Sequence, residues 1–170
     1  MSTRHSRAPV VVSFTASHQQ EAVNLILNIQ NVEAGLDISL DDQPDLVDIE
    51  RSYLSAGGAF WVALDEQEKV VGTIGLMIQT PEVAVLKKFF VAVDWRGKDK
   101  DCASRLYESL IAFARSRGLT TIVLDTPSSA ARSHTFYRRH GFEQISGSEL
   151  PVQYDYPDRG SLLFRLRLTE

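Results

Sequence analysis

The amphipathic segment at residues 103–114 limits the folds open to this chain more than any other segment does. Its apolar side chains recur at the i, i+3, i+4 and i+7 spacing of one helix face. They are Ala103, Leu106, Tyr107, Leu110, Ile111 and Ala114. Strand-like apolar runs precede the segment at residues 83–93 and follow it at residues 120–125. Two strands joined by a helix can lie parallel and adjacent with a right-handed crossover, so we expect helices layered on a sheet.

The rest of the chain predicts further strands and helices around this unit. Strand-like patterns cover four more segments, residues 9–14, 59–64, 70–78 and 161–168. Helical patterns cover residues 21–29 and 44–54. Thr126 and Pro127 suit the N-cap and first turn of another helix, which we expect to end near His140. The chain therefore predicts one α+β domain spanning residues 1–170.

Composition argues against several classes of protein. The net charge of −4 gives no reason to expect nucleic acid as a partner. No apolar run approaches the ~20 residues that cross a bilayer, and the N-terminus lacks the pattern of a secretion signal. Cys102 is the only cysteine, and the four histidines have no metal-ligand spacing. We therefore expect a cytoplasmic protein with no disulfide, no metal and no membrane partner.

A basic loop, WRGKDKD, joins the strand at residues 83–93 to the helix. The unpaired amides and the positive dipole end of a helix N-terminus favour an anion, and ligands of layered α/β folds sit at the carboxyl ends of strands. Arg96, Lys98 and Lys100 add positive charge, so a phosphate-bearing ligand is one interpretation. A solvated basic turn before an ordinary helix is the other, and the spacing alone leaves both open.

Two sequence elements resemble the GNAT N-acetyltransferase superfamily. They are VLKKFFVAVDWRG at residues 85–97, followed by the helix, and HTFYRRHGF at residues 134–142. The resemblance implies a mixed central sheet of about six to seven strands flanked by about four helices. In this sheet an antiparallel meander leads into a parallel pair splayed around the cofactor. The resemblance also implies that acetyl-CoA is the co-substrate and that backbone amides of the loop bind its pyrophosphate.

The loop departs from the family pattern, in which a glycine, one variable position and a small residue open the helix. Counted back from the helix, Ala103 takes the last small position and Asp101 takes the glycine position. The loop is then two residues longer than the common one, and Asp99 belongs to the extension. A carboxylate at position 101 repels a phosphate, and a side chain there restricts the backbone. Asp101 also suits a helix N-cap, so it either faces the ligand or caps the helix.

The resemblance implies roles for individual residues. Tyr137, which precedes the glycine–phenylalanine pair, is the acid for the departing thiolate, since a phenol of pKa about 10 can donate to it. The alternative is that Tyr137 only packs with Phe136 against the sheet. Backbone groups at residues 90–93 hold the acetyl carbonyl and pair with the pantetheine arm. The cofactor contacts implied are Phe90, Val91, Val93, Arg96, Gly97, Lys98, Lys100, Asp101, Cys102, Ala103 and Ser133.

Other positions carry weaker hypotheses. Glu82 and Asp125 are the nearest candidates for a general base, although each is more typical of a turn or a cap. Lys87 and Lys88 must point to opposite faces of the sheet, so one of them lies on the substrate side. Tyr154 falls in the loop before the last strand, which either borders the acceptor site or forms a surface turn.

Two functions of different class follow from these residues. The first is an N-acetyltransferase that moves an acetyl group from acetyl-CoA to a primary amine of a small molecule or peptide. The second is a GNAT-fold module that binds an acyl-CoA with little or no turnover, which Asp101 and the missing base favour. A phosphate-ligand module unrelated to acyl transfer is a third interpretation. We expect an amine substrate as the partner, and a homodimer stays open.

Overall fold

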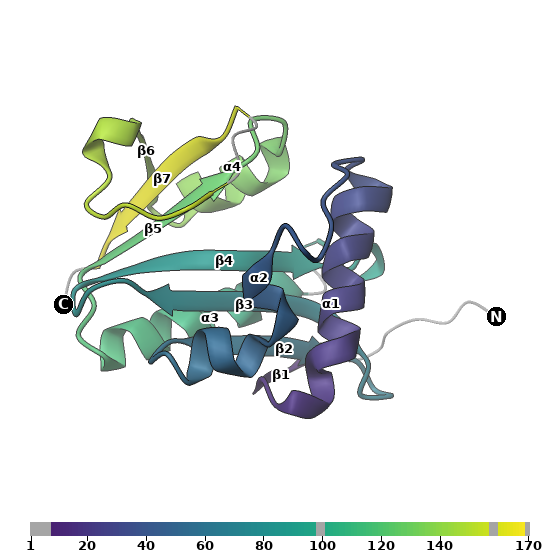
Figure 1. Cartoon of the computed structure of the whole chain (residues 1–170). Coiled ribbons are helices and arrows are strands. Elements are labelled where there is room, and N and C mark those ends of the chain that lie inside the picture. The colour runs from purple at the N-terminus through teal and green to yellow at the C-terminus, as the bar shows by residue number, and fades with distance from the viewer. Residues whose placement is uncertain (1–7, 98–100, 157–159, 169–170) are drawn as a thin grey trace. The chain divides into compact units, whose positions relative to one another are not determined.

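The computed structural model describes residues 8–97, 101–156 and 160–168, which form two compact units (Figure 1). The first unit contains the described residues up to Met77 together with Lys87–Phe113. The second contains Ile78–Leu86 and the described residues from Ala114 onward. Strand β4 (Val83–Val91) and helix α3 (Cys102–Ser116) each run from one unit into the other.

An antiparallel sheet forms the centre of the first unit. Its strands are β1 (Val10–Ser13), β2 (Ala59–Leu64) and β3 (Val70–Ile78). The hairpin predicted at residues 59–78 is confirmed, since Ala59 pairs with Leu76 and Phe60 with Gly75. The predicted first strand is also confirmed, because Val10 pairs with Leu64.

Helices cover both faces of these strands, with α1 (Gln19–Asn28) and α2 (Pro44–Val47) in front and α3 behind in the view of Figure 1. On the α1 side, a cluster of buried side chains forms the core: Phe14, Ala22, Val23, Ile26, Leu46, Ile49, Tyr53, Phe60, Val62 and Val70. On the α3 side, the rings of Trp61 and Phe113 meet edge to face at 5.7 Å. The two-residue period of β2 explains this division, because Phe60 and Trp61 point to opposite faces.

The prediction of one helix over residues 44–54 is wrong. The α-helix ends at Val47, Asp48 is extended with φ −146°, and a π-helical turn follows at Glu50–Leu54. Side-chain hydrogen bonds compete with the helix at this point. The Asp48 carboxylate accepts the Arg51 amide at 3.1 Å, and Gln19 of α1 donates to the Leu46 carbonyl at 2.7 Å.

The second unit is built on three further strands and one helix. They are β5 (Thr121–Thr126), α4 (Ala131–Arg139), β6 (Glu143–Ile145) and β7 (Leu162–Arg167). The predicted parallel pair is confirmed, since Val83 of β4 pairs with Thr121 and Val85 with Val123. Strand β7 lies between β5 and β6 and is antiparallel to both. The strands follow the order β1-β2-β3-β4-β5-β7-β6, and β4 takes part in both units. This is a mixed sheet, as the resemblance implies.

Helix α4 starts later than the sequence predicts. Thr126 is not an N-cap but the last residue of β5, where it pairs with Leu162. Pro127 opens a turn in which its carbonyl accepts the Ala130 amide at 3.0 Å, and the helix begins at Ala131. The predicted end near His140 is confirmed, because His140 is the C-cap of the helix.

Candidate active site

The chain turns sharply after β4, in the basic loop for which a phosphate-bearing ligand is one of the two interpretations. A 3-10 turn spans Val93–Trp95, and the Trp95 amide donates to the Ala92 carbonyl at 2.8 Å. The Trp95 side chain is buried and anchors the turn, whereas Val93 is exposed. Gly97 follows with φ +107°, a backbone conformation that glycine adopts without strain. Lys98, Asp99 and Lys100 lie outside the described residues.

Arg96 braces this loop from two sides. Its Nε donates to the Val91 carbonyl at 2.8 Å, and its Nη2 pairs with Glu33 Oε1 at 2.6 Å. Glu33 ends the π-helical turn Ile29–Glu33 that follows α1. The guanidinium therefore ties the end of β4 to the end of α1, and the side chain still has 26% of its surface exposed.

Asp101 precedes α3 in a left-handed conformation with φ +61°. Its carbonyl accepts the Arg105 amide at 3.1 Å, as an N-cap residue does, and its amide donates to the Gly97 carbonyl at 3.3 Å. Its carboxylate pairs with Arg105 Nε at 3.4 Å, and the side chain is half exposed. The carbonyl of Asp101 thus acts as that of a helix N-cap, and its left-handed backbone is one that the glycine of the family pattern would adopt. Its carboxylate points along the helix towards Arg105.

At the first turn of α3, the predicted ligand contacts involve main-chain amides more than side chains. Cys102 is fully buried, and its sulfur lies 3.1 Å from where a Cβ on Gly72 would stand. Burial, and then the Asp101 carboxylate, raise the pKa of the Cys102 thiol to about 12, so the thiol is neutral and unreactive near pH 7. Ala103 is half-buried. The predicted contacts of Cys102 and Ala103 therefore depend on their N–H groups, which the start of a helix leaves without intrahelical partners.

Phe90 and Val91 lie in the half-buried end of β4. The first residues of this strand, 83–86, are buried, and residues 87–91 are only partly so. Within this second half Lys88 has φ +56°, which breaks the regular pleat of the strand. An irregular strand disrupts its hydrogen-bond ladder locally. Within residues 90–93, the Val91 carbonyl accepts Arg96 Nε, the Ala92 carbonyl accepts the Trp95 amide, and the Ala92 amide donates to the Val71 carbonyl. The predicted role of the backbone at residues 90–93 in binding the acetyl group stays a prediction.

In the second unit, Tyr137 is an aromatic core residue that is 6% exposed. The ring centroids of Phe142 and Phe164 lie 5.5 and 5.9 Å from its own. The Phe142 amide donates to the Tyr137 carbonyl at 3.0 Å, which closes the end of α4. Ser133, one turn earlier on α4, is half-buried. The Tyr137 ring also meets the Phe136 ring edge to face at 6.1 Å, so it does pack with Phe136. The role of its hydroxyl stays a prediction.

Sequence reasoning misses a tyrosine–carboxylate pair in the second unit. The Tyr154 hydroxyl donates to Asp125 Oδ1 at 3.1 Å, although the two residues are 29 positions apart. Burial, and then the Asp125 carboxylate, raise the pKa of Tyr154, so the phenol stays protonated. One oxygen of Asp125, one of the two candidate bases, therefore accepts a hydrogen bond from a neutral phenol. Glu82 lies instead in an exposed turn, where its carbonyl accepts the Thr120 amide at 2.9 Å.

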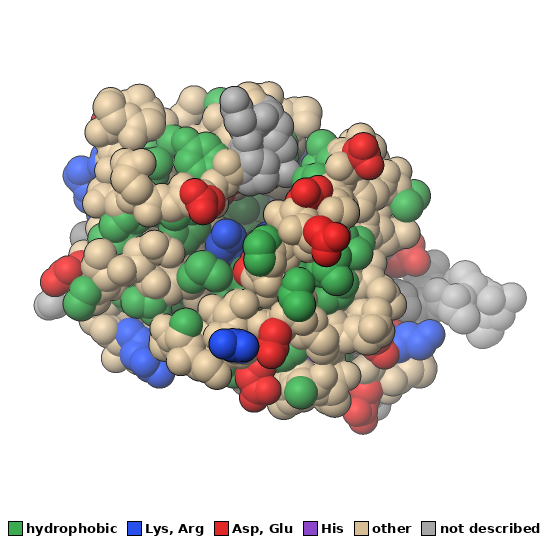
Figure 2. Space-filling view, viewed as in Figure 1, with side chains coloured by type: hydrophobic (Ala, Val, Ile, Leu, Met, Phe, Trp, Pro, Cys, Tyr) green, Lys and Arg blue, Asp and Glu red, His purple; other side chains and the backbone are tan. Residues whose placement is uncertain are grey.

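Carboxylates crowd the segment that joins α1 to the π-helical turn at Glu50–Leu54, and Figure 2 shows acidic side chains over this part of the first unit. They are Glu33, Asp37, Asp41, Asp42, Asp45, Asp48 and Glu50, and no lysine or arginine falls between them in the sequence. Side-chain amides hold the segment in place. Asn31 donates to the Ile38 carbonyl at 2.7 Å, and the buried amides of Gln30 and Gln43 pair at 2.9 Å.

No metal centre is evident in the parts of the chain that the structure describes, since no three His, Cys, Asp or Glu side chains gather there in a way that suits an ion. The buried His134 makes a structural contact instead, with its Nε2 2.9 Å from the Pro127 carbonyl. Over the same described residues, every helix is too short or too polar to cross a membrane.

Comparison with known proteins identifies relatives of this chain. A model of the acetyltransferase (GNAT) family matches residues 24–142. The chain is also similar to N-acetyltransferase 8B of Homo sapiens, with 36% identity over 117 residues, which are 66% of this chain and 50% of that protein. The chain thus spans about half the length of the curated relatives that it matches.

Solved structures extend the likeness over almost the whole chain. An acetyltransferase from Streptococcus agalactiae 2603 is 41% identical with a TM-score of 0.90, and the match covers 95% of this chain and 99% of that one. A GNAT family acetyltransferase from Elizabethkingia anophelis, solved with acetyl-CoA bound, has a TM-score of 0.60 and 17% identity. That match covers 96% of this chain and 100% of that one, and at this identity it shows the fold alone.

Proposed function

Because the chain belongs to the acetyltransferase (GNAT) family, we propose that it moves an acetyl group from acetyl-CoA to a primary amine of a small molecule or peptide. The loop between β4 and α3 is the observation that carries this proposal. Gly97 and Asp101, at its two described ends, both have left-handed backbones, and the loop opens on the N-terminus of a 15-residue helix. The unpaired amides of a helix N-terminus favour an anion.

The pyrophosphate of acetyl-CoA binds to the amides of this loop and of the first turn of α3. Gly97, Cys102 and Ala103 contribute main-chain N–H groups, and the basic side chains of Lys98 and Lys100 add positive charge. Arg96 keeps the loop in shape through Val91 and Glu33. Pairing of the Asp101 carboxylate with Arg105 reduces its repulsion of the phosphates, since opposite charges 3.4 Å apart partly cancel at a distance.

The thioester end of acetyl-CoA lies along the irregular half of β4. Backbone groups of Phe90 and Val91 hold the acetyl carbonyl and the pantetheine arm, and Val93 borders the loop that follows. The Ser133 hydroxyl, on α4, contributes a further polar contact to the co-substrate. None of these β4 contacts needs a particular side chain, because each is made by the main chain.

Transfer proceeds by direct attack of the neutral amine. The amine nitrogen forms a bond to the thioester carbon, the carbon–sulfur bond breaks, and the sulfur leaves with the bonding electrons. The Tyr137 hydroxyl donates a proton to this sulfur, and the new ammonium nitrogen loses a proton to water or to a base. Hydrogen bonds from β4 amides stabilise the negative charge that develops on the carbonyl oxygen, usually the largest single contribution to such a reaction.

The acidic segment supports an amine as the acceptor. A run of carboxylates lowers the local electrostatic potential and concentrates cations, so it draws in an ammonium group before the amine loses its proton. We also propose that the chain is one functional acetyltransferase domain and that it works in the cytoplasm. Its oligomeric state is either a monomer or a homodimer.

The second candidate function is an acyl-CoA-binding module with little or no turnover. The aromatic packing of Tyr137 and the aspartate at position 101 are the observations that favour it. Both functions predict binding of acetyl-CoA, and they differ in whether free thiol is released.

An amine screen separates the two functions. The chain is incubated with acetyl-CoA and a panel of small amines and lysine-containing peptides, and release of free thiol is measured. We expect turnover with part of the panel. Binding of acetyl-CoA without thiol release from any amine favours the module instead.

Removal of one hydroxyl tests the acid. We expect Tyr137→Phe to lower kcat by about 10²-fold, because general acid catalysis contributes roughly that much, and to leave the Kd for acetyl-CoA within about twofold. Tyr107→Phe is the matched control, since Tyr107 is an equally buried tyrosine on α3, and its kcat is expected to stay that of the wild type. If Tyr137→Phe turns over like the wild type, the assignment of the acid is wrong.

A further inference from the structure

Lys88 is an unusual residue for its position in β4. Its φ of +56° lies in the left-handed region, which lysine seldom adopts and which glycine, asparagine and aspartate tolerate best. It is also the only left-handed residue among the strand residues that the structure describes. Such strain persists where the surroundings over-determine it, and it clusters at functional sites.

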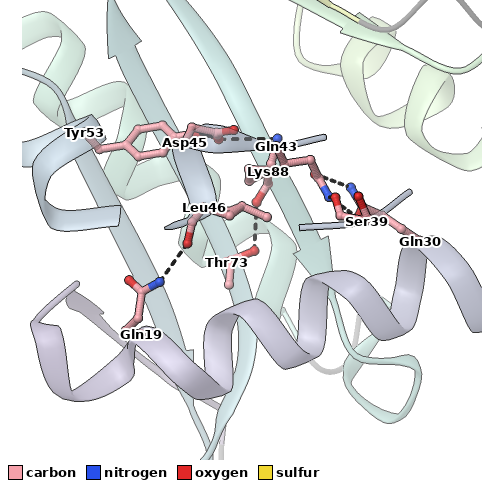
Figure 3. A network of polar contacts seen from close by, with 9 residues as sticks. All are labelled: Gln19, Gln30, Ser39, Gln43, Asp45, Leu46, Tyr53, Thr73 and Lys88. Atoms are coloured by element: carbon pink, nitrogen blue, oxygen red, sulfur yellow. Dashed lines mark hydrogen bonds and ion pairs between the residues drawn. The ribbon is translucent and has the colours of Figure 1, made fainter. Parts of the chain in front are cut away.

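The backbone of Lys88 is held from β3. The Thr73 hydroxyl donates to the Lys88 carbonyl at 2.8 Å, and Thr73 is completely buried (Figure 3). Three residues further on, the Val91 carbonyl accepts Arg96 Nε at 2.8 Å. Side chains therefore fix both ends of the segment that contains Phe89 and Phe90.

The side chain of Lys88 is held from α2. Its Nζ lies 3.4 Å from Asp45 Oδ2, and only 12% and 13% of the two side chains are exposed. The hydroxyl of the buried Tyr53 donates to the same Asp45 oxygen at 2.6 Å. Burial, and then the Asp45 carboxylate, raise the pKa of Tyr53, which keeps the phenol protonated as a donor. Tyr53 thus orients the carboxylate that receives the Lys88 ammonium.

Asp45 itself is fixed by the first unit. Gln19 of α1 donates to the carbonyl of Leu46, the next residue, at 2.7 Å, and Gln43 pairs with Gln30 of the turn that follows α1 (Figure 3). The carboxylate is therefore a rigid point on which the ammonium can anchor. Because taking two charges out of water can cost more than their pairing returns, stability alone is a weak reason for this ion pair, which points to a further role.

We propose that Asp45 and Lys88 are positioning residues that hold β4 in its irregular form, so that the backbone at Phe89 and Phe90 is presented to the acetyl group. This inference rests on the proposed function. Phe90 is two residues beyond Lys88, roughly 7 Å along a strand, so a change of backbone conformation at Lys88 re-aims the groups at Phe90. Lys88 and Asp45 act through the strand and touch neither acetyl-CoA nor the amine.

Two charge-removing variants test the pair in an enzyme assay. Lys88→Met keeps the length of the side chain, and Asp45→Asn keeps an acceptor for the Tyr53 hydroxyl. We expect each to lower kcat by about tenfold, the order of effect for a misplaced reacting group, with the KM for the amine within about twofold of the wild type. The double variant is expected to lose no more than the larger single loss, because both changes release the same strand.

Binding supplies a readout that is independent of turnover. In calorimetry the wild type is expected to bind acetyl-CoA more tightly than CoA, and the two variants to lose that preference, because the misplaced backbone no longer meets the acetyl oxygen. Lys88→Gly should recover most of the kcat lost in Lys88→Met, since glycine adopts a left-handed backbone without the ion pair. Lys69→Met, at an exposed lysine in the connection between β2 and β3, is the control and is expected to match the wild type.

Three results overturn the inference. A large rise in the KM for the amine with unchanged kcat would mean that the pair binds the acceptor. Unchanged kcat and KM together with a lower free energy of unfolding would mean that the pair is only structural. A wild type that neither binds acetyl-CoA nor transfers acetyl removes the proposed function, and this inference with it, before any variant is made.

Discussion

The two halves of β4 differ although they belong to one strand. Residues 83–86 are buried, and three of them pair with β5 in a regular parallel ladder. Residues 87–91 are half-buried and contain the left-handed Lys88. Side chains of Thr73 and Arg96, which come from outside the strand, hold carbonyls of this second half.

This difference separates two tasks of a functional strand. The first half follows the rule for buried parallel strands, with apolar side chains on both faces and a continuous ladder, and it contributes stability. The second half is only half-buried and contains the left-handed Lys88, and we propose that its backbone serves the acetyl group. It also leads into a loop with two more left-handed residues, Gly97 and Asp101.

Aspartate substitutions in the two halves should have the largest effect on stability. Val85 is completely buried, so Val85→Asp is expected to lower the free energy of unfolding by at least about 4 kcal/mol, because a buried charge without a partner is very costly. Val91 is half-buried, and for Val91→Asp we expect a loss under about 2 kcal/mol. Urea denaturation followed by circular dichroism measures both. Equal losses would mean that the halves do not differ in their contribution to stability.

Substitutions at Asp101 should have a smaller effect. We expect Asp101→Gly to raise the free energy of unfolding by about 0.5–1 kcal/mol, since relief of a left-handed aspartate outweighs the loss of a half-exposed ion pair with Arg105. It should also tighten the binding of acetyl-CoA, because a carboxylate leaves the phosphate site.

Asp101→Ala is the control for this change. It removes the same carboxylate but retains a Cβ on a left-handed backbone, so its free energy of unfolding is expected to fall below that of the wild type. If glycine and alanine have the same effect on stability, backbone strain at position 101 is not the cause.

Most of the fold could be predicted because its elements have regular periods. The stripe on α3, the hairpin of β2 and β3, and the apolar run of β5 all carry their structure in local pattern. The predictions were wrong where contacts between side chains far apart in the sequence determine where a helix or strand ends. Hydrogen bonds from Gln19 to Leu46 and from the Arg51 amide to the Asp48 carboxylate break the helix predicted over residues 44–54. Pairing with Leu162 keeps Thr126 in β5.

The candidate site was less predictable, for the same reason. The sequence shows the basic loop and the glycine at position 97, but no local pattern indicates that Lys88 is left-handed. Nor does it show that Asp45 lies against Lys88, 43 positions further along the chain, or that Tyr154 reaches Asp125. These contacts join residues distant in the sequence, and a charged residue inside a strand is the one local sign that a partner is needed.

Calorimetric titration of the full chain with acetyl-CoA tests the central claim most directly, that the loop between β4 and α3 is an acyl-CoA site. The account predicts saturable binding at one site per chain, and similar binding of desulfo-CoA, which retains the pyrophosphate but lacks the thiol. The absence of any binding heat for either compound at millimolar concentration would contradict it.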